Sequence, residues 1–187
     1  MDILEKNNPI LRRKAKPLSL KEITSPKTHT LITRMHEVLL HEPDGVALAA
    51  PQIGVSIRLF IVSPKIFLAG KPGVEEKRTS RTDKKKLTPA DNCIYINPQI
   101  LKRSRKKTSM DEGCLSVRNY YGKVERYDKA TISAYDEHGK KFTRGASGLL
   151  AQIFQHEMDH LEGVLFSDRA EPLFYVPPET RKKRDEI

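Results

Sequence analysis

The chain of 187 residues contains no tryptophan and only two cysteines, Cys93 and Cys114. Two cysteines are too few for a disulfide framework, so we expect a protein of a reducing compartment, the cytoplasm. The sequence also lacks an apolar run near the ~20 residues that span a bilayer, and it opens without a charged segment leading into an apolar stretch. We therefore expect neither a membrane segment nor a secretory signal, and Cys114 is free to act as a thiolate ligand or a nucleophile.

Basic residues outnumber acidic ones, and the formal net charge is +10 at pH 7. The excess lies in three segments: 71–90 has seven basic and three acidic residues, 102–107 has five basic residues, and 181–187 has four basic and two acidic residues. The remainder of the chain is nearly neutral. Such segments are typical of solvated loops and tails, and they also suit an anionic surface such as RNA. Both interpretations stay open.

The length suits a single domain over residues 1–187. The predicted elements are a helix over 25–41, strands over 57–62 and 94–101, a hairpin over 129–144 and a helix over 146–163. Ser25 is the expected N-cap of the first helix, and Gly163 is the expected stop of the second. We expect 71–90 to form an exposed basic loop and 171–187 a Pro-rich basic tail without a long helix. This order favours the α+β class over alternating β–α–β units.

The late helix carries QHEMDH at residues 155–160. Positions four apart lie on one face of a helix, so His156 and His160 can bind a single ion. Glu157 lies on the neighbouring flank, where a carboxylate can reach a water beside that ion. This pattern is typical of metal-dependent hydrolases, although two histidines also occur on ordinary surface or core helices. A catalytic metal needs a third protein ligand and an open position.

The third ligand can be sought at several positions. Phe166 stands six residues after His160, where one protease class has a further histidine. Glu171 and Glu179 suit another protease class, but both lie in the Pro-rich tail. Cys114 follows a strand-like segment, and a cysteine with two histidines suits a borderline-soft divalent ion. Because Cys114 can also be a small buried thiol, an HExxH peptidase remains an alternative.

Three segments in order resemble the signature motifs of the peptide deformylase family: GVALAAPQIG at 45–54, EGCLS at 112–116 and QHEMDH at 155–160. The similarity extends through most of the chain, and three motifs in order are highly specific. The resemblance implies an α+β fold with mixed or antiparallel sheets around a central HExxH helix, together with an N-terminal helix. It also implies a cytoplasmic, bacterial-type enzyme that hydrolyses the N-formyl group from the formylmethionine of nascent polypeptides and releases formate.

The same resemblance implies a role for each matched residue. The implied metal ligands are Cys114, His156 and His160. Glu157 is implied as the general acid and base, and the Gln52 side chain and Leu115 backbone N–H as the groups that hold the developing oxyanion. The implied backbone edges for substrate binding are Gly45, Val46 and Gly113. One divalent ion per chain is implied, Fe²⁺ in the cell and Zn²⁺, Ni²⁺ or Co²⁺ in purified protein.

Helical spacing adds candidates for a substrate pocket. Leu149 and Ile153 lie on or beside the stripe that carries the two histidines, so they can line a pocket for an unbranched methionine side chain or belong to the core. The residues of this helix that are better placed to face the core are Leu150, Phe154, Met158 and Leu161. Arg126 is a candidate partner of Glu112, and Asp159 is expected to pair with a nearby cation.

Two positions depart from the family pattern: Ala47 replaces the usual glycine, and Arg118 replaces the usual proline. Alanine with a left-handed backbone would cost about 1 kcal/mol, and at a close backbone approach its methyl group would crowd the substrate. A second alternative is therefore a non-catalytic relative that binds RNA through its basic segments. For the enzyme, we expect formylmethionyl nascent peptides as partners, the ribosome or RNA as a further partner, and no required protein partner or membrane.

Overall fold

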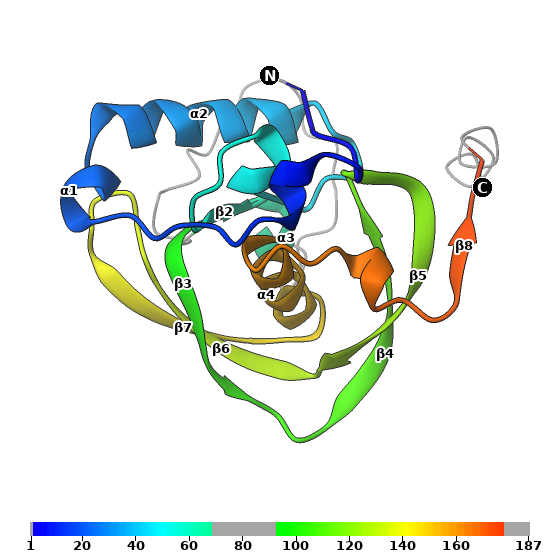
Figure 1. Ribbon diagram of the computed structural model, residues 1–187. Coiled ribbons are helices and arrows are strands. Elements are labelled where there is room, and N and C mark those ends of the chain that lie inside the picture. The colour runs from blue at the N-terminus through cyan, green and yellow to red at the C-terminus, as the bar shows by residue number, and fades with distance from the viewer. Residues whose placement is uncertain (1, 69–92, 178–187) are drawn as a thin grey trace, which may run out of the picture.

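The computed structural model describes residues 2–68 and 93–177 (Figure 1). The predicted basic loop over 71–90 lies outside the described residues, as does the tail beyond residue 177. Within the described part, no helix is long and apolar enough to cross a bilayer. Cys93 and Cys114 are not joined in a disulfide.

The predicted early helix is confirmed, and it packs along one side of the molecule (Figure 1). α2 (Pro26–Leu40) begins after Ser25, whose side chain accepts a hydrogen bond from the Thr28 N–H, and a proline fits the first turn. The residues buried along α2 recur at helical spacing: Thr28, Ile32, Met35 and Leu39. A single-turn helix, α1 (Leu20–Ile23), precedes it and carries a capping box formed by Ser19 and Glu22.

One antiparallel sheet of five strands forms the larger layer, in the order β1-β2-β3-β6-β7. Its strands are β1 (Ala47–Ala49), β2 (Leu59–Val62), β3 (Ile94–Arg103), β6 (Lys129–Tyr135) and β7 (Lys141–Ser147). The predicted hairpin is β6–β7, with His138 and Gly139 in its turn. β1 lies at the edge of this sheet, so its outer backbone groups have no strand partner within the described residues.

A second, three-stranded antiparallel sheet has the order β4-β5-β8. Its strands are β4 (Lys107–Cys114), β5 (Val117–Tyr127) and β8 (Leu173–Tyr175). The long β4–β5 hairpin shifts register between Gly113 and Cys114, just before its turn. The hairpin therefore ends with a cysteine beside a tight turn, and that turn faces the late helix.

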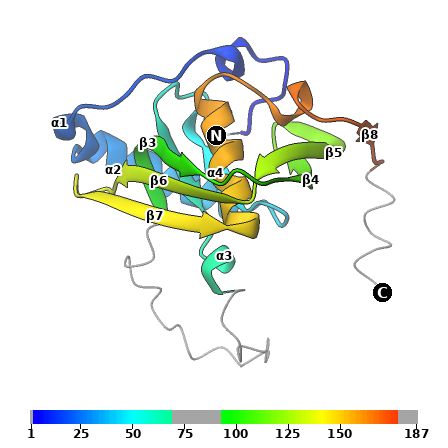
Figure 2. The same cartoon turned by 90° about the horizontal axis from the view of Figure 1, so that it is seen from below.

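The late helix, α4 (Gly148–Leu161), lies in the centre, between the two sheets (Figures 1 and 2). The shorter elements are η1 (Pro9–Arg12), η2 (Ala50–Ile53), α3 (Lys65–Leu68) and η4 (Phe166–Asp168). The chain before α1 crosses the end of α4, where the Ala15 N–H donates to the Leu161 carbonyl at 2.9 Å. The α+β class and the central HExxH helix predicted from the sequence are both confirmed.

Candidate metal centre and active site

Three predicted ligands come together from two elements. α4 presents His156 and His160 on one face, and β4 ends at Cys114 opposite them. The ligand atoms of these residues all lie within 4.8 Å of one another, and Cys114 Sγ is 3.2 Å from His160 Nε2. It is the one cluster of three or more histidine, cysteine or acidic residues within the described ranges that could hold a metal ion.

A carboxylate on the Nδ1 side of the ring fixes the orientation of His156. Nδ1 of His156 lies 2.9 Å from Glu112 Oε2, so this nitrogen carries the proton and donates to the carboxylate. Glu112 also accepts two hydrogen bonds from Arg126, at 2.7 Å and 2.9 Å. Because Nδ1 is occupied, Nε2 of His156 is the nitrogen that remains for a metal ion. The predicted pair between Glu112 and Arg126 is confirmed.

Asp159 extends this network on the outer side of the helix. Its carboxylate accepts from Arg126 Nη1 at 2.7 Å and from Arg169 Nη2 at 3.1 Å, as expected of an acid paired with cations. Burial opposes the ionisation of Glu112, but hydrogen bonds from Arg126 and His156 outweigh it and lower the pKa of Glu112 to about 2. The acid behind His156 is therefore a carboxylate at neutral pH.

The electrostatics of the pocket favour a thiolate beside the imidazoles. Burial opposes ionisation of the Cys114 thiol, but the charge of His160 and hydrogen bonds from both histidines lower the pKa of Cys114 to about 5. A thiolate with two imidazole nitrogens is a ligand set that suits a borderline-soft divalent cation. The residues present thus fit a metal ion in number, donor type and mutual distance.

Glu157 lies beside this cluster and is buried. Within the described part of the chain its Oε2 atom has no hydrogen-bond partner. Burial raises the pKa of Glu157 to about 7, against the lowering effect of the two neighbouring histidines. A carboxyl group with a pKa near neutrality can both accept and release a proton under ordinary conditions.

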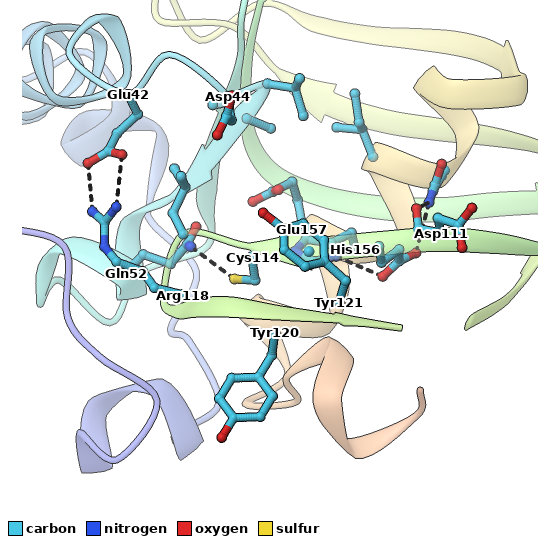
Figure 3. Close-up of a pocket in the computed structure, with 18 of the residues that line it drawn as sticks. Glu42, Asp44, Gln52, Asp111, Cys114, Arg118, Tyr120, Tyr121, His156 and Glu157 are labelled. Atoms are coloured by element: carbon cyan, nitrogen blue, oxygen red, sulfur yellow. Dashed lines mark hydrogen bonds and ion pairs between the residues drawn. The ribbon is translucent and has the colours of Figure 1, made fainter. Parts of the chain in front are cut away.

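Gln52 enters the site from η2, on the other wall. Its Oε1 atom accepts from the Ala49 N–H at 2.8 Å, which fixes the amide so that Nε2 faces the β4–β5 turn. Nε2 donates to Ser116 Oγ at 3.2 Å and lies 3.5 Å from Cys114 Sγ (Figure 3). Leu115 lies in the same turn and lines the same cleft.

The cleft has a volume of about 360 Å³ and is lined from three sides. One wall is the segment that leads into β1, including Gly45, Val46 and Ala47; the other is the end of β4, including Gly113. From α4 it is lined by Leu149, Gln152, Ile153, His156 and Glu157. All the residues that we predicted for substrate binding therefore line this one cleft. Leu149 is 53% exposed, whereas Ile153 is only 4% exposed and also belongs to the core.

Two backbone positions explain why small residues line the walls. A Cβ atom on Gly113 would lie 2.8 Å from the Tyr121 ring, and one on Gly45 would lie 2.7 Å from Leu39 Cδ1. Ala47, in contrast, belongs to a strand and is not among the described residues with positive φ. The strained-backbone explanation of the usual glycine therefore does not apply to Ala47, which lines the cleft and is also part of the core.

The other positions considered for the third ligand do not supply one within the described residues. Phe166 is buried and packs against the His156 ring with 6.3 Å between the ring centres. Glu171 is exposed and precedes β8, and Glu179 lies outside the described residues.

Three further contacts in or beside the cleft were not identified from the sequence. Ser116 accepts from Gln52, Glu42 pairs with Arg118, and Gln152 donates to the Asp111 carbonyl at 2.9 Å. Each joins residues from different elements, so no local pattern could have indicated it.

At the centre of the α+β fold, a half-buried cysteine and two histidines that could hold a metal ion lie beside the buried Glu157, an arrangement typical of metal-dependent hydrolases with an HExxH helix. Residues 1–174 match the family model described as polypeptide deformylase, and the chain belongs to that family. It is a metalloenzyme that removes the formyl group from nascent polypeptides.

Curated relatives and solved structures agree with this assignment. The chain is 34% identical to the peptide deformylase of Christiangramia forsetii, covering 92% of this chain and 83% of the relative. It is 39% identical to that of Halothermothrix orenii, covering 90% and 92%. Against chloroplastic/mitochondrial peptide deformylase 1A of Arabidopsis thaliana it is 37% identical and spans 61% of the relative's length. The crystal structure of the Thermotoga maritima peptide deformylase superposes with a TM-score of 0.72 at 31% identity, covering 91% of this chain and 97% of that one.

Proposed function

We propose that Cys114, His156 and His160 hold one divalent metal ion, and that Glu157, Gln52 and Leu115 carry out deformylation beside it. The observation that supports this most strongly is the 3.2 Å approach of Cys114 Sγ to His160 Nε2 next to the buried, unpaired Oε2 of Glu157. The half-buried Cys114 also packs against a small apolar cluster, but the closeness of its sulfur to the His160 imidazole favours a ligand set.

In this proposal the metal ion, when bound, supplies Lewis-acid chemistry by lowering the pKa of a water and polarising the formyl oxygen. Glu157 accepts the proton of the attacking water, since its pKa of about 7 suits a general base at neutral pH. It then returns that proton to the nitrogen of the leaving amine. The C–N bond of the formamide breaks, formate leaves, and the peptide keeps a free N-terminus.

Gln52 and Leu115 hold the charge that develops on the formyl oxygen. Gln52 Nε2 is directed to the turn that carries Cys114, and the backbone N–H of Leu115 belongs to that turn. Both donors are positioned before the substrate arrives, so little reorganisation accompanies the reaction. Such a donor is worth roughly 3–4 kcal/mol of transition-state stabilisation.

The peptide part of the substrate binds between the two walls of the cleft. Gly45 and Val46 offer backbone groups on one side, and Gly113 offers them on the other. Leu149 and Ile153 line the pocket for the methionine side chain. Because one methylene is worth only ~1–3 kcal/mol in such a pocket, norleucine is tolerated in place of methionine.

The metal is Fe²⁺ in the cell, and Zn²⁺, Ni²⁺ or Co²⁺ replace it in purified protein; the thiolate and imidazole set accommodates each of them. The chain acts as a single catalytic domain over residues 1–187. It works in the cytoplasm of a bacterial-type cell and requires no protein partner.

Contact with ribosomal RNA is proposed from the described basic run over 102–107. Lys102, Arg103 and Arg105 are exposed, and none of them forms an ion pair with an acidic group among the described residues, whereas Lys106 pairs with Asp128 at 3.3 Å. Exposed cations of this kind favour phosphate backbones. Salt-dependent co-sedimentation with ribosomes supports the contact, and its absence at low salt contradicts it.

A kinetic assay tests the proposed enzyme directly. The protein is loaded with Ni²⁺ or Fe²⁺ and given formyl-Met-Ala-Ser, and formate release is measured. Glu157→Gln is expected to abolish turnover while keeping the metal, since it removes only the proton acceptor. Casein cleavage without formate release would support the HExxH peptidase instead. Full metal loading with no turnover on either substrate would support the non-catalytic alternative.

A further inference from the structure

Two polar links join the walls of the cleft, at different depths. At the floor, Gln52, which is only 2% exposed, donates to Ser116. At the mouth, Glu42 and Arg118 form a two-point ion pair, with Nη2 to Oε1 at 2.7 Å and Nη1 to Oε2 at 3.2 Å (Figure 3). Glu42 and Arg118 both line the cleft, and neither is part of the metal centre.

Each end of the ion pair is anchored in a firm piece of backbone. The Glu42 N–H donates to the Leu39 carbonyl at 3.3 Å, and the Gly45 N–H donates to the Glu42 carbonyl at 3.0 Å, so Glu42 belongs to the hydrogen-bonded end of α2. Arg118 is the second residue of β5, directly after Val117, which pairs with Cys114. The ion pair therefore connects the end of α2 to the turn of the β4–β5 hairpin.

The two links together constrain more than either does alone. A link at the floor does not restrain the rim of the cleft, whereas a second link at the rim opposes its opening. A peptide strand that pairs with both walls needs ~4.8 Å between its backbone and each edge, so the width of the cleft decides how well both edges bind. The position of Arg118 is also where the family usually has proline, so here an ion pair is available to hold this part of the turn.

We propose that the Glu42–Arg118 ion pair sets the width of the cleft and so positions the peptide part of the substrate. This inference rests on the proposed function, in which the segment around Gly45 and the end of β4 at Gly113 bind the peptide backbone. Both members of the pair are positioning residues, since they act through the walls rather than on the reacting atoms. Their contribution appears in KM for peptides that reach between the walls, and kcat stays the same.

The exposure of the pair determines the size of the effect and its salt dependence. The side chain of Arg118 is 51% exposed and that of Glu42 is 20% exposed. A pair in such a setting typically changes an equilibrium about two- to fivefold. Salt screens it, because the Debye length falls from about 8 Å at 0.15 M to about 3 Å at 1 M.

The experiment compares kcat and KM of four metal-loaded variants with those of the wild type: Glu42→Gln, Arg118→Gln, Arg118→Glu and the double reversal Glu42→Arg/Arg118→Glu. The substrates are formyl-Met-Ala-Ser and formyl-Met amide, of which only the tripeptide extends along the walls. Lys107→Glu is the matched control, because Lys107 and Glu125 form an exposed ion pair at 3.6 Å within the three-stranded sheet and outside the cleft.

The proposal expects both glutamine variants to raise KM for the tripeptide about two- to fivefold, with kcat within twofold. Arg118→Glu raises KM about tenfold, and the double reversal returns it to within about twofold of the wild type. KM for formyl-Met amide is unchanged, and 1 M NaCl raises KM of the wild type but not of Glu42→Gln.

Unchanged KM in the single variants, equal effects on both substrates, or no rescue by the double reversal would each overturn the proposal. If a single variant fails to fold, as judged by thermal melting, the KM of the double reversal and the salt dependence of the wild-type KM still test whether the ion pair positions the peptide. A wild type that is fully metal-loaded but turns over neither substrate contradicts the proposed function instead. The two failures are therefore distinguishable.

Discussion

At the residue scale, the site depends on a buried cation behind the metal ligands. Arg126 is the shared partner of Glu112 and Asp159, and its side chain is almost fully enclosed. From the sequence, Arg126 was a candidate partner of Glu112. The sequence could not show that one guanidinium serves two acids, since Asp159 lies 33 residues further along the chain and reaches Arg126 only through the fold.

Replacing Arg126 with leucine is expected to destabilise the protein by about 3–5 kcal/mol, because it leaves the buried Glu112 without its cation and removes one of the two cations that pair with Asp159. Urea unfolding of the metal-free protein measures this loss directly. Lys107→Met, which removes an exposed cation from the same sheet, should change stability by no more than about 0.5 kcal/mol. A loss below about 1 kcal/mol for Arg126→Leu would show that the network contributes little.

Gln52 provides a second prediction at this scale. Gln52→Leu is expected to lower kcat about 10²–10³-fold, since it removes one donor to the developing oxyanion. Ser116→Ala removes only the resting partner of the amide nitrogen, so its kcat should fall less than tenfold. The comparison uses steady-state rates on formyl-Met-Ala-Ser at equal metal content. Equal losses in both variants would indicate that the Gln52–Ser116 contact matters, rather than the donor itself.

At the element scale, α4 is bounded by glycines that adopt left-handed backbone. Gly148 has φ +56°, and a Cβ atom added there would meet nothing within 4 Å. Gly163 has φ +78°, and a Cβ atom there would lie 2.7 Å from the Arg12 carbonyl oxygen. Gly163 was identified from the sequence because it directly follows the helical pattern. The tight approach of the N-terminal segment could not be predicted, because no local pattern links residues 12 and 163.

The two glycines therefore respond differently to alanine. Gly148→Ala should cost only the conformational penalty of about 1–2 kcal/mol. Gly163→Ala should cost about 1–3 kcal/mol more, because the methyl group also collides with a backbone carbonyl. Chemical denaturation of both variants tests this difference. Equal losses in the free energy of unfolding would mean that the N-terminal segment moves aside from the added methyl group at no measurable cost.

Elements were predicted best where they bury an apolar face. α2 and α4 were both located to within two residues at each end, since their buried residues recur at helical spacing. The β4–β5 hairpin was missed as an element, although it holds Cys114. In β4 the sole buried residue is Glu112, so this strand shows no alternation of apolar and polar residues.

At the scale of the whole molecule, motifs located the chemistry but not the contacts around it. Cys114, His156 and His160 could be grouped because three ordered motifs are specific. The ion pair of Glu42 and Arg118 joins residues 76 positions apart that carry no recognisable pattern. Long-range pairs of this kind depend on how the two sheets meet, which composition and periodicity do not determine.

Glu162 is also considered at the scale of the whole molecule, because its ion pairs join the N-terminal segment and the residue before β2 to the end of α4. It accepts from Arg58 at 2.6 Å and pairs with Lys14 at 2.9 Å. Partial burial opposes its ionisation, but these hydrogen bonds outweigh it and lower the pKa of Glu162 below its ordinary value of 4.5. The stability that the carboxylate contributes is thus present above pH 4.5 and lost as the pH falls through the lowered value.

Glu162→Gln should therefore be less stable than the wild type at pH 7, and the difference should shrink below pH 4.5. Thermal melts of both proteins across this range provide the measurement. Glu125→Gln, at an exposed pair of the other sheet, is the matched control. If the stability difference between Glu162→Gln and the wild type grew as the pH fell, Glu162 would not have a lowered pKa in the folded state.

Metal removal should lower the melting temperature of the whole molecule, since an ion that binds only the folded state stabilises it. At about 100 times the dissociation constant this contribution is about 2.7 kcal/mol. Melting with and without a chelator, followed by return of Ni²⁺, checks the effect. Cys114→Ser should reduce the response to the ion, whereas an unchanged response would exclude the thiolate as a ligand.

The central place of α4 has a consequence for when a metal ion can be held. Its histidines meet the thiol only where the end of β4 packs against the helix. Cys114 and His160 are 46 positions apart in the sequence, so their closeness depends on tertiary structure. The complete ligand set therefore exists only in the folded chain.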